Sequence, residues 1–236
     1  MSEHKIDVVM ITNGKRPELF KQTGESLYDN CDDATYFNLV VVHDGGKSNT
    51  DYGNANIVIT DPVGASACRN IGASSIPKYR RGQYVMFIDD DVYMCPGWDE
   101  KLIDAYERTN GPAVRSIISG HAHPYNHTVL ATLRGFNDHQ NLVQTTVLST
   151  VHIFMDWKVW DGIGYWIEPG GPAGSEDVDY CKRAQSLGIG LVVTDPHCVI
   201  HTGLTSSRGH PIVGHDLMVE QNVKLTKLYH VAVLNK

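Results

Sequence analysis

Three consecutive carboxylates, Asp89, Asp90 and Asp91, directly follow the apolar run at residues 84–88. Carboxylate oxygens suit a hard divalent cation that also binds phosphate oxygens. Neighbouring acids repel one another, so their ionised forms need a cation or strong hydrogen-bond donors close by. On a continuous strand, Asp89 and Asp91 would share one face. The triplet therefore predicts a metal site, and a polar strand end that caps the next helix is the alternative.

A second acidic pair, Glu176 and Asp177, follows a glycine-rich segment at residues 170–174. Ser175 can cap a helix that begins here, and acids in a first helical turn interact favourably with the helix dipole. In a functional interpretation, one of the two acids is a general base and the glycine-rich loop closes over a substrate. The segment alone leaves both interpretations open.

A glycine turn at Gly64 leads into a helix-like segment that contains Arg69 and Asn70. The backbone N–H groups at the start of such a helix suit a phosphate group. The guanidinium of Arg69 could add a charge-assisted hydrogen bond. Many helices start with a similar turn, so this segment indicates an anion site only together with other features.

The histidines and aromatic residues allow structural as well as functional interpretations. His201 ends a short apolar strand, where it is either structural or a ligand. A zinc site built on His121, His123 and His127 is a weaker alternative, because the spacing matches no established zinc template and Pro124 interrupts the segment. Four aromatic side chains could either stack on a sugar ring or lie in the core: Trp157, Trp160, Tyr165 and Trp166.

The first half of the chain alternates strand-like and helix-like segments. Its strands are near-continuous apolar runs, typical of a parallel sheet with helices on both faces, and the alternation predicts an open doubly wound sheet. Ligands bind beyond the carboxyl ends of such strands. The polar residues expected there are Thr12, Asn13, Asp44, Asp61 and the Asp89–Asp91 triplet. The expected strands are 6–11, 37–42, 56–59 and 84–88, and the expected helices are 17–30, 65–73 and 98–108.

The second half of the chain is less regular, with polar loops between its expected elements. We expect strands at 113–119, 128–134, 142–155, 191–194 and 198–201, a helical turn at 156–162, and helices at 175–187 and 216–230.

Composition narrows the class of protein. The 236 residues carry a formal net charge of −7, which argues against general nucleic-acid binding because such binding needs many cations. Five cysteines without a CxxC pair indicate reduced thiols of a cytoplasmic protein. The N-terminus lacks the apolar core of a signal peptide, and no apolar run reaches the roughly 18 residues of a membrane helix. We therefore expect a cytoplasmic protein without a membrane span.

Together these segments resemble the GT-A glycosyltransferases, in particular those of family 2, over residues 5–203. Their order and spacing make the match specific for fold and reaction class. The resemblance implies an α/β fold of the GT-A type: a Rossmann-like, mostly parallel central sheet flanked by helices, with a smaller antiparallel sheet on the acceptor side. The segments are DVVMITNGKRPELFKQTGESL, VVVHDGG, GASACRNIGASSIPKYRRGQYVMFIDDDVYMCPGWDEKL and GSEDVDYCKRAQSLGIGLVVTDPHCVIHTG.

The resemblance also implies one domain over residues 1–236. Within it, residues 1–112 would form the nucleotide-sugar-binding half and residues 113–203 the acceptor and catalytic half. Residues 204–236 would form a C-terminal loop and helix.

Donor-binding roles follow from the same resemblance. In the family, the segment after the first strand and the acid after the second strand bind the nucleoside, although His43 stands where a further acid is usual. An Arg-Asn pair in the second helix lies near the ribose or the diphosphate. The implied donor-binding residues are Thr12, Asn13, Asp44, Gly64, Arg69, Asn70, Asp89 and Asp90.

The metal and base motifs of the family also fall on this chain. Its DxD motif falls on the acidic triplet, which implies Asp91 as a direct metal ligand and Asp89 facing the ribose or a water on the metal. The histidine beyond the following strand, a metal or phosphate contact, falls on His201. The Glu-Asp pair falls on Glu176 and Asp177, which implies Asp177 as the catalytic base.

We therefore expect a metal-dependent glycosyltransferase that moves a sugar from a nucleoside-diphosphate donor, a UDP-sugar first, to an acceptor hydroxyl with Mn²⁺ or Mg²⁺. The resemblance implies inversion of the anomeric centre. Residues 113–170 leave open a carbohydrate, a lipid-linked glycan, a protein or a modified nucleic-acid base as acceptor, and Arg208 and His210 could close over the diphosphate. The alternatives are a nucleotidyltransferase with a similar acidic metal site, a metallohydrolase built on His121, and a non-catalytic sugar-nucleotide-binding module.

Overall fold

The computed structural model describes residues 5–32, 37–45, 55–110, 115–121, 131–133, 141–167, 175–195 and 197–202. Several sequence-based predictions lie outside these residues. They are the C-terminal helix at 216–230, the glycine-rich segment 170–174, and the side chains of His123, His127, Arg208 and His210.

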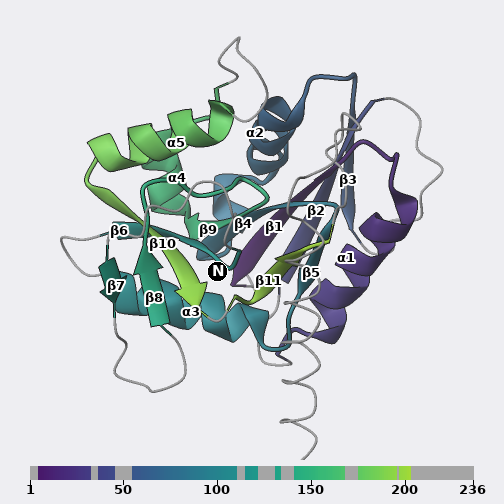
Figure 1. Cartoon of the computed structure of the whole chain (residues 1–236). Helices are drawn as coiled ribbons and strands as arrows, with labels where there is room; N and C mark the ends of the chain where they lie inside the picture. Colours follow the sequence, from purple (N-terminus) through teal and green to yellow (C-terminus); the bar gives the residue numbers. More distant parts are fainter. Residues whose placement is uncertain are drawn as a thin grey trace, which may run out of the picture.

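A nine-stranded sheet with the order β3-β2-β1-β4-β9-β6-β10-β8-β7 forms the centre of the molecule (Figure 1). Strands from both halves of the chain take part, because β9 lies between β4 and β6. The strands are β1 (Ile6–Thr12), β2 (Phe37–Asp44), β3 (Asn56–Thr60), β4 (Tyr84–Asp89), β6 (Arg115–Ser119), β7 (Ala131–Leu133), β8 (Asn141–Gln144), β9 (His152–Asp156) and β10 (Ile189–Asp195).

Most of the described strands run in one direction. β3, β2, β1 and β4 pair in parallel, as their near-continuous apolar runs predict. β9 runs antiparallel to both β4 and β6, so β6 points the same way as β4, and β10 is parallel to β6. β8 is antiparallel to β10 and β7 antiparallel to β8. Only β8 and β9 therefore oppose the other described strands of this sheet, and the predicted mostly parallel sheet is confirmed.

Helices cover both faces of the sheet (Figure 1). On β1, Val9 and Ile11 face one helical layer, and Ile6, Val8 and Met10 face the other. This alternation is the period of two that strand geometry imposes. One layer holds α2 (Ala65–Ser75), α4 (Trp157–Ile163) and α5 (Ser175–Ser186), and the other holds α1 (Pro17–Asp29) and α3 (Trp98–Thr109).

A second, two-stranded antiparallel sheet pairs β5 (Val92–Met94) with β11 (Val199–His201). Its register places Val92 opposite His201. Just beyond this pair, the backbone N–H of Thr202 donates to the carbonyl of Asp91 at 2.7 Å, and the Thr202 hydroxyl donates to the same oxygen at 2.8 Å. The small sheet therefore holds the end of β11 beside the acidic triplet.

Two local predictions were wrong. Residues 142–155 form two strands, β8 and β9, rather than one. β6 and β10 lie between β8 and β9 in the sheet, so the connecting residues 145–151 must leave the sheet plane to cross them. Strand β4 ends at Asp89, and Asp90 and Asp91 form a turn, so the argument from one shared strand face does not hold.

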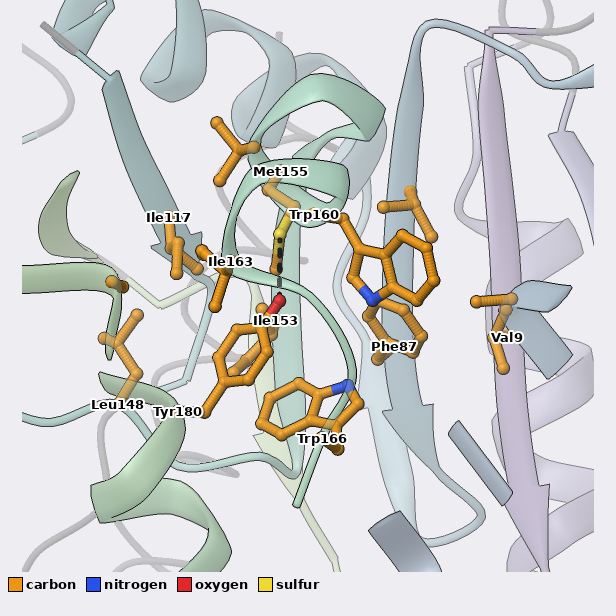
Figure 2. Close-up of a cluster of buried hydrophobic side chains, with 14 of the residues drawn as sticks. Val9, Phe87, Ile117, Leu148, Ile153, Met155, Trp160, Ile163, Trp166 and Tyr180 are labelled. Carbon is orange, nitrogen blue, oxygen red and sulfur yellow. Dashed lines mark hydrogen bonds between the residues drawn. The ribbon is translucent and has the colours of Figure 1, made fainter. Parts of the chain in front are cut away.

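The core beneath α4 and α5 is rich in aromatic side chains (Figure 2). Trp166 stacks on Tyr180 with ring centroids 3.6 Å apart and meets the edge of Phe87 at 6.0 Å. Tyr180 is fully buried in this cluster and anchors α5 against the sheet. Residues three apart on a helix lie on neighbouring positions of one face, so this anchor also fixes the direction of Asp177.

Candidate active site

The acidic triplet lies at the carboxyl edge of the sheet, where the ends of β1 and β4 are neighbours. The register pairs Ile11 with Asp89, so Thr12 follows directly beside the triplet. Arg16 precedes α1, whose first residue is Pro17, and the short loop between β1 and α1 keeps it at this edge. Polar groups separated in sequence thus meet at the position expected for ligands of such a sheet.

Asp91, which is buried, pairs with the half-buried His201. Nε2 of His201 lies 3.1 Å from Oδ2 of Asp91, while Oδ1 of Asp91 is buried and has no hydrogen-bond partner among the described residues. Burial opposes ionisation of Asp91, but the hydrogen bond and charge of His201, together with Arg16, hold its pKa below the ordinary value. Burial likewise opposes protonation of His201, yet Asp91 and Asp89 raise its pKa. Asp91 and His201 therefore form a hydrogen-bonded pair that keeps one spare acceptor, Oδ1 of Asp91.

Asp90 is held by residues of the β1 end. Its carboxylate accepts from the Thr12 hydroxyl at 2.5 Å and from Nη2 of Arg16. The other terminal nitrogen of Arg16 donates to Oδ2 of Asp91, so one guanidinium bridges both acids. Burial raises the pKa of Asp90 to about 6, although Arg16 and Thr12 oppose the shift. Arg16 supplies the strong donors that the adjacent acids require.

Asp89 is held by Arg69 of helix α2. Nη2 of Arg69 donates to Oδ1 of Asp89 at 2.7 Å and to the carbonyl of Thr150 at 3.2 Å. Arg69 is buried, and its Nε and Nη1 have no hydrogen-bond partner among the described residues. Buried donors of a charged group that stay unpaired are costly, so these two nitrogens are candidates for contact with an anionic ligand.

Asp177 lies in the first turn of α5. Its Oδ1 is a buried atom without a hydrogen-bond partner in the described part of the chain. Burial raises the pKa of Asp177 to about 6, against the opposing effects of Thr150 and Arg69. Thr150 and Arg69 therefore connect the surroundings of Asp177 with those of Asp89. A carboxylate with a pKa near neutrality and a spare oxygen is suited to accept a proton.

The other predicted donor-binding residues have partners within the protein. Asp44 accepts from the backbone N–H of Val63 at 2.7 Å and from that of Gly64, so it braces the turn before α2. Both polar atoms of the Asn70 amide bond the backbone of Trp166, at 2.8 Å each. Asn13 accepts from the backbone of Lys15 at 3.0 Å. A carboxylate oxygen can accept a second hydrogen bond, so the nucleoside contact of Asp44 stays a prediction, as do those of Asn13 and Asn70.

Three of the four aromatic candidates lie in the core. Trp157, Trp160 and Trp166 are buried, and Tyr165 is exposed. Of the proposed zinc ligands, only His121 is described, and its ring lies 5.8 Å from that of His201 in an edge-to-face arrangement. The core role, one of the two interpretations from the sequence, is thus confirmed for Trp157, Trp160 and Trp166.

Glu176, the neighbour of Asp177 in the predicted acidic pair, is half-buried.

The Asp91–His201 pair fits a divalent cation that takes further ligands from a substrate. Within the described ranges, no three His, Cys, Asp or Glu side chains already stand together as a metal site. Magnesium is commonly held by one or two carboxylates while substrate phosphates and water supply the rest. The unpartnered Oδ1 of Asp91 is the acceptor that such a cation would satisfy.

Two contributors to the site escaped the sequence analysis, Arg16 and Thr150. Arg16 could have been found from charge balance, because the triplet needs nearby donors and Arg16 follows the end of the neighbouring strand by four residues. Thr150 accepts from Arg69 with its backbone carbonyl and also forms a hydrogen bond with Asp177 through its side chain. It stands in the segment that sequence patterns assigned to a strand.

Solved structures share this fold. Two crystal structures of S. aureus TarS, a GT-A-type glycosyltransferase, each match 80% of this chain with a TM-score of 0.54. The identity is 17% over 36% of one TarS chain, and 18% over 60% of the chain titled TarS 1-349. This chain therefore spans between about a third and three-fifths of those chains.

The similarity shows that the chain has a GT-A fold, and at this identity it assigns no residue a role. No protein-family model matches the chain, and no curated protein matches its sequence. No helix of the described residues is long and apolar enough to cross a membrane.

Proposed function

We propose that this protein is a metal-dependent, inverting glycosyltransferase that moves a sugar from a nucleoside-diphosphate donor to an acceptor hydroxyl. A UDP-sugar is the first candidate donor. One observation carries the proposal. Asp91 and Asp177 each keep a buried carboxylate oxygen without a hydrogen-bond partner among the described residues. Arg69, which has unpartnered donors of its own, donates to Asp89 in the same triplet as Asp91, and its charge also acts on Asp177. Unused polar atoms at one edge of a sheet support a ligand site.

In this proposal, the leaving diphosphate is stabilised by Asp91, His201 and Arg69. Breaking the anomeric C–O bond places additional negative charge on the diphosphate. Asp91 and His201 would hold Mn²⁺ or Mg²⁺, which supplies Lewis-acid stabilisation of that charge when bound. Nε and Nη1 of Arg69 can donate charge-assisted hydrogen bonds to the ribose or the diphosphate.

Asp177 is the proposed catalytic base. An acceptor hydroxyl is a weak nucleophile, and a carboxylate that takes its proton during attack lowers the barrier. The hydroxyl oxygen bonds to the anomeric carbon as the diphosphate departs with the electron pair of the broken bond, and the proton passes to Asp177. Direct attack inverts the anomeric centre. With a pKa of about 6, Asp177 is largely ionised at neutral pH and ready to act.

The donor-side contacts and the location belong to the same proposal. Thr12, Asn13 and Asp44 surround the ends of β1 and β2, which supports a nucleoside there. Asp89 faces the ribose in this proposal, with Arg69 as its partner. The free thiols of all five cysteines support a reducing, cytoplasmic location.

Release of a nucleoside diphosphate from a sugar nucleotide tests the reaction even when the acceptor is unknown, because water can slowly take the place of the acceptor hydroxyl. We expect chelation with EDTA to abolish release and Mn²⁺ or Mg²⁺ to restore it. Full activity in EDTA, with no metal found by elemental analysis, would contradict the metal assignment. A thermal-shift screen of sugar nucleotides with Mn²⁺ identifies the base and sugar, since a ligand that binds only the folded state raises its stability.

The products distinguish the rival functions. A nucleotidyltransferase consumes a nucleoside triphosphate and releases pyrophosphate, whereas the proposed enzyme releases a nucleoside diphosphate. A metallohydrolase built on His121 would contain stoichiometric zinc. A non-catalytic module would bind the sugar nucleotide and leave it intact.

A further inference from the structure

Arg16 occupies the side of Asp91 that faces Asp90. Its Nη1 donates to Oδ2 of Asp91, and its Nη2 donates to Oδ1 of Asp90. Oδ2 of Asp91 is also the oxygen that lies 3.1 Å from Nε2 of His201. The guanidinium therefore engages the same carboxylate oxygen as the second proposed metal ligand.

Two cations cannot share Asp91 at low cost. A divalent ion and a guanidinium that contact one carboxylate repel each other strongly, because the surroundings are buried and screening is weak. Asp90 and Asp91 are both buried, which keeps the effective dielectric low. A metal ion at Asp91 and the present position of Arg16 are thus in competition.

Arg16 has the freedom to release Asp91 while it keeps Asp90. The two hydrogen bonds come from different terminal nitrogens and go to different residues. The Arg16 side chain is 22% exposed, and its Nε has no hydrogen-bond partner in the described part of the protein. A change in the Arg16 side-chain torsions can therefore break the bond to Asp91 separately from the bond to Asp90, and Nε is available to donate to an incoming anion.

We propose that Arg16 is an internal counter-cation that weakens metal binding at Asp91 in the nucleotide-free protein and leaves Asp91 when a metal–diphosphate complex binds. This inference rests on the proposed function, because it requires a metal at Asp91. It has a thermodynamic consequence: the free protein binds metal weakly, and a nucleoside diphosphate strengthens metal binding. Coupling between two ligands is reciprocal, so metal must strengthen nucleotide binding by the same factor.

Titration of the full chain with Mn²⁺ alone, followed by the electron paramagnetic resonance signal of free Mn²⁺, tests the inference without any activity assay. We expect Arg16→Met to bind Mn²⁺ at least about tenfold more tightly than the wild type, since a nearby positive charge is removed. Addition of UDP should tighten Mn²⁺ binding in the wild type and have a smaller effect in Arg16→Met.

Two further variants control the experiment. Lys15→Gln removes the same charge from the neighbouring exposed residue, and we expect its Mn²⁺ affinity to equal that of the wild type. Arg16→Lys keeps the charge as a compact ammonium that lacks the planar fork needed to bridge two carboxylates. We expect Arg16→Lys to bind Mn²⁺ with intermediate affinity, and it serves in place of Arg16→Met if circular dichroism shows the latter to be unfolded.

The outcomes separate this inference from the proposed function. Equal Mn²⁺ affinity in the folded Arg16 variants and the wild type, with tightening by UDP retained, overturns the role of Arg16 and leaves the metal-dependent enzyme standing. No Mn²⁺ binding in any of the proteins, with or without UDP, overturns both. A similar gain of affinity in Lys15→Gln overturns the competition at Asp91 in favour of a general charge effect.

Discussion

Two buried acids, one on β1 and one in the turn that follows the neighbouring strand β4, differ in how completely the protein satisfies their hydrogen-bonding capacity. Asp7, near the start of β1, is fully buried. Its Oδ1 accepts from the Asn38 amide at 3.0 Å, and its Oδ2 accepts from the Gly82 backbone and from the indole of Trp157 at 2.8 Å each. At the other end of the sheet, Asp91 has two partners on one oxygen and none on the other among the described residues.

The difference separates a structural acid from a candidate catalytic one. A satisfied buried carboxylate stabilises one arrangement of the chain, and here Asp7 ties β1 to β2, to the segment before β4 and to α4. A carboxylate with a buried spare oxygen instead carries a cost that a ligand can relieve. Asp177 and the spare donors of Arg69 belong to the second class. Burial alone therefore does not identify a site, whereas unpartnered polar atoms that gather at the carboxyl edge of the sheet support one.

The largest expected effect is on the turnover number, when Asp177, an acid with an unpartnered buried oxygen, is changed. We expect Asp177→Asn to lower kcat by about 10² to 10⁴-fold, which is typical for loss of a general base. Donor binding should largely survive, because Asp177 acts on the acceptor. The measurement is kcat for sugar transfer, with donor affinity followed by thermal shift.

The matched control is Asp179→Asn on the same helix, whose carboxylate pairs with Arg183 four residues on. That variant should turn over as the wild type does. Near-normal turnover in Asp177→Asn would show that Asp177 is not the base. It would also contradict the claim that buried acids with an unpartnered oxygen are the functional ones.

The next largest effect is on the stability of the fold, when Asp7, an acid with both oxygens hydrogen-bonded, is changed. We expect Asp7→Ala to lower the free energy of unfolding by about 3 kcal/mol, because one buried and two half-buried donors lose their acceptor at once. Turnover of the folded fraction should be unchanged. Urea unfolding at neutral pH measures the stability, and the rate per folded molecule measures the activity.

Asp161→Ala is the control for Asp7, since Asp161 is an exposed acid paired with Arg81. Exposed pairs contribute little, so its cost should stay below about 1 kcal/mol. A loss of turnover in Asp7→Ala at unchanged stability would place Asp7 among the functional residues and overturn the comparison on its structural side.

The smallest effect is a pH dependence of the rate. Asp177 acts as a base only when ionised, and its pKa of about 6 means that it takes up a proton as the pH falls through 6. We therefore expect kcat/KM to be level above that pH and to fall about tenfold per unit below it. Circular dichroism at each pH verifies that the protein stays folded. A profile that is flat down to pH 5 would contradict the assignment of Asp177, with its raised pKa, as the catalytic base.

The sequence predicted the parallel half of the fold closely. β1, β2 and β4 begin where expected and end one or two residues beyond the predicted limits, and α1 begins at Pro17. Runs of apolar residues bounded by polar ones, and a proline at a first helical turn, are local signals that need no knowledge of the remote chain. β9 was merged with β8 in the prediction, because its place between β4 and β6 depends on segments far away in sequence.

The amino-acid order by itself determined where the acids emerge, because the length of the apolar run in β4 sets which residues reach the edge of the sheet. Only the tertiary structure decided which acids are paired and which keep a spare oxygen. Arg16 and His201 reach Asp91 across 75 and 110 residues, and Trp157 reaches Asp7 across 150. Such contacts arise from packing of the whole sheet and its helices, and no local pattern along the chain encodes them.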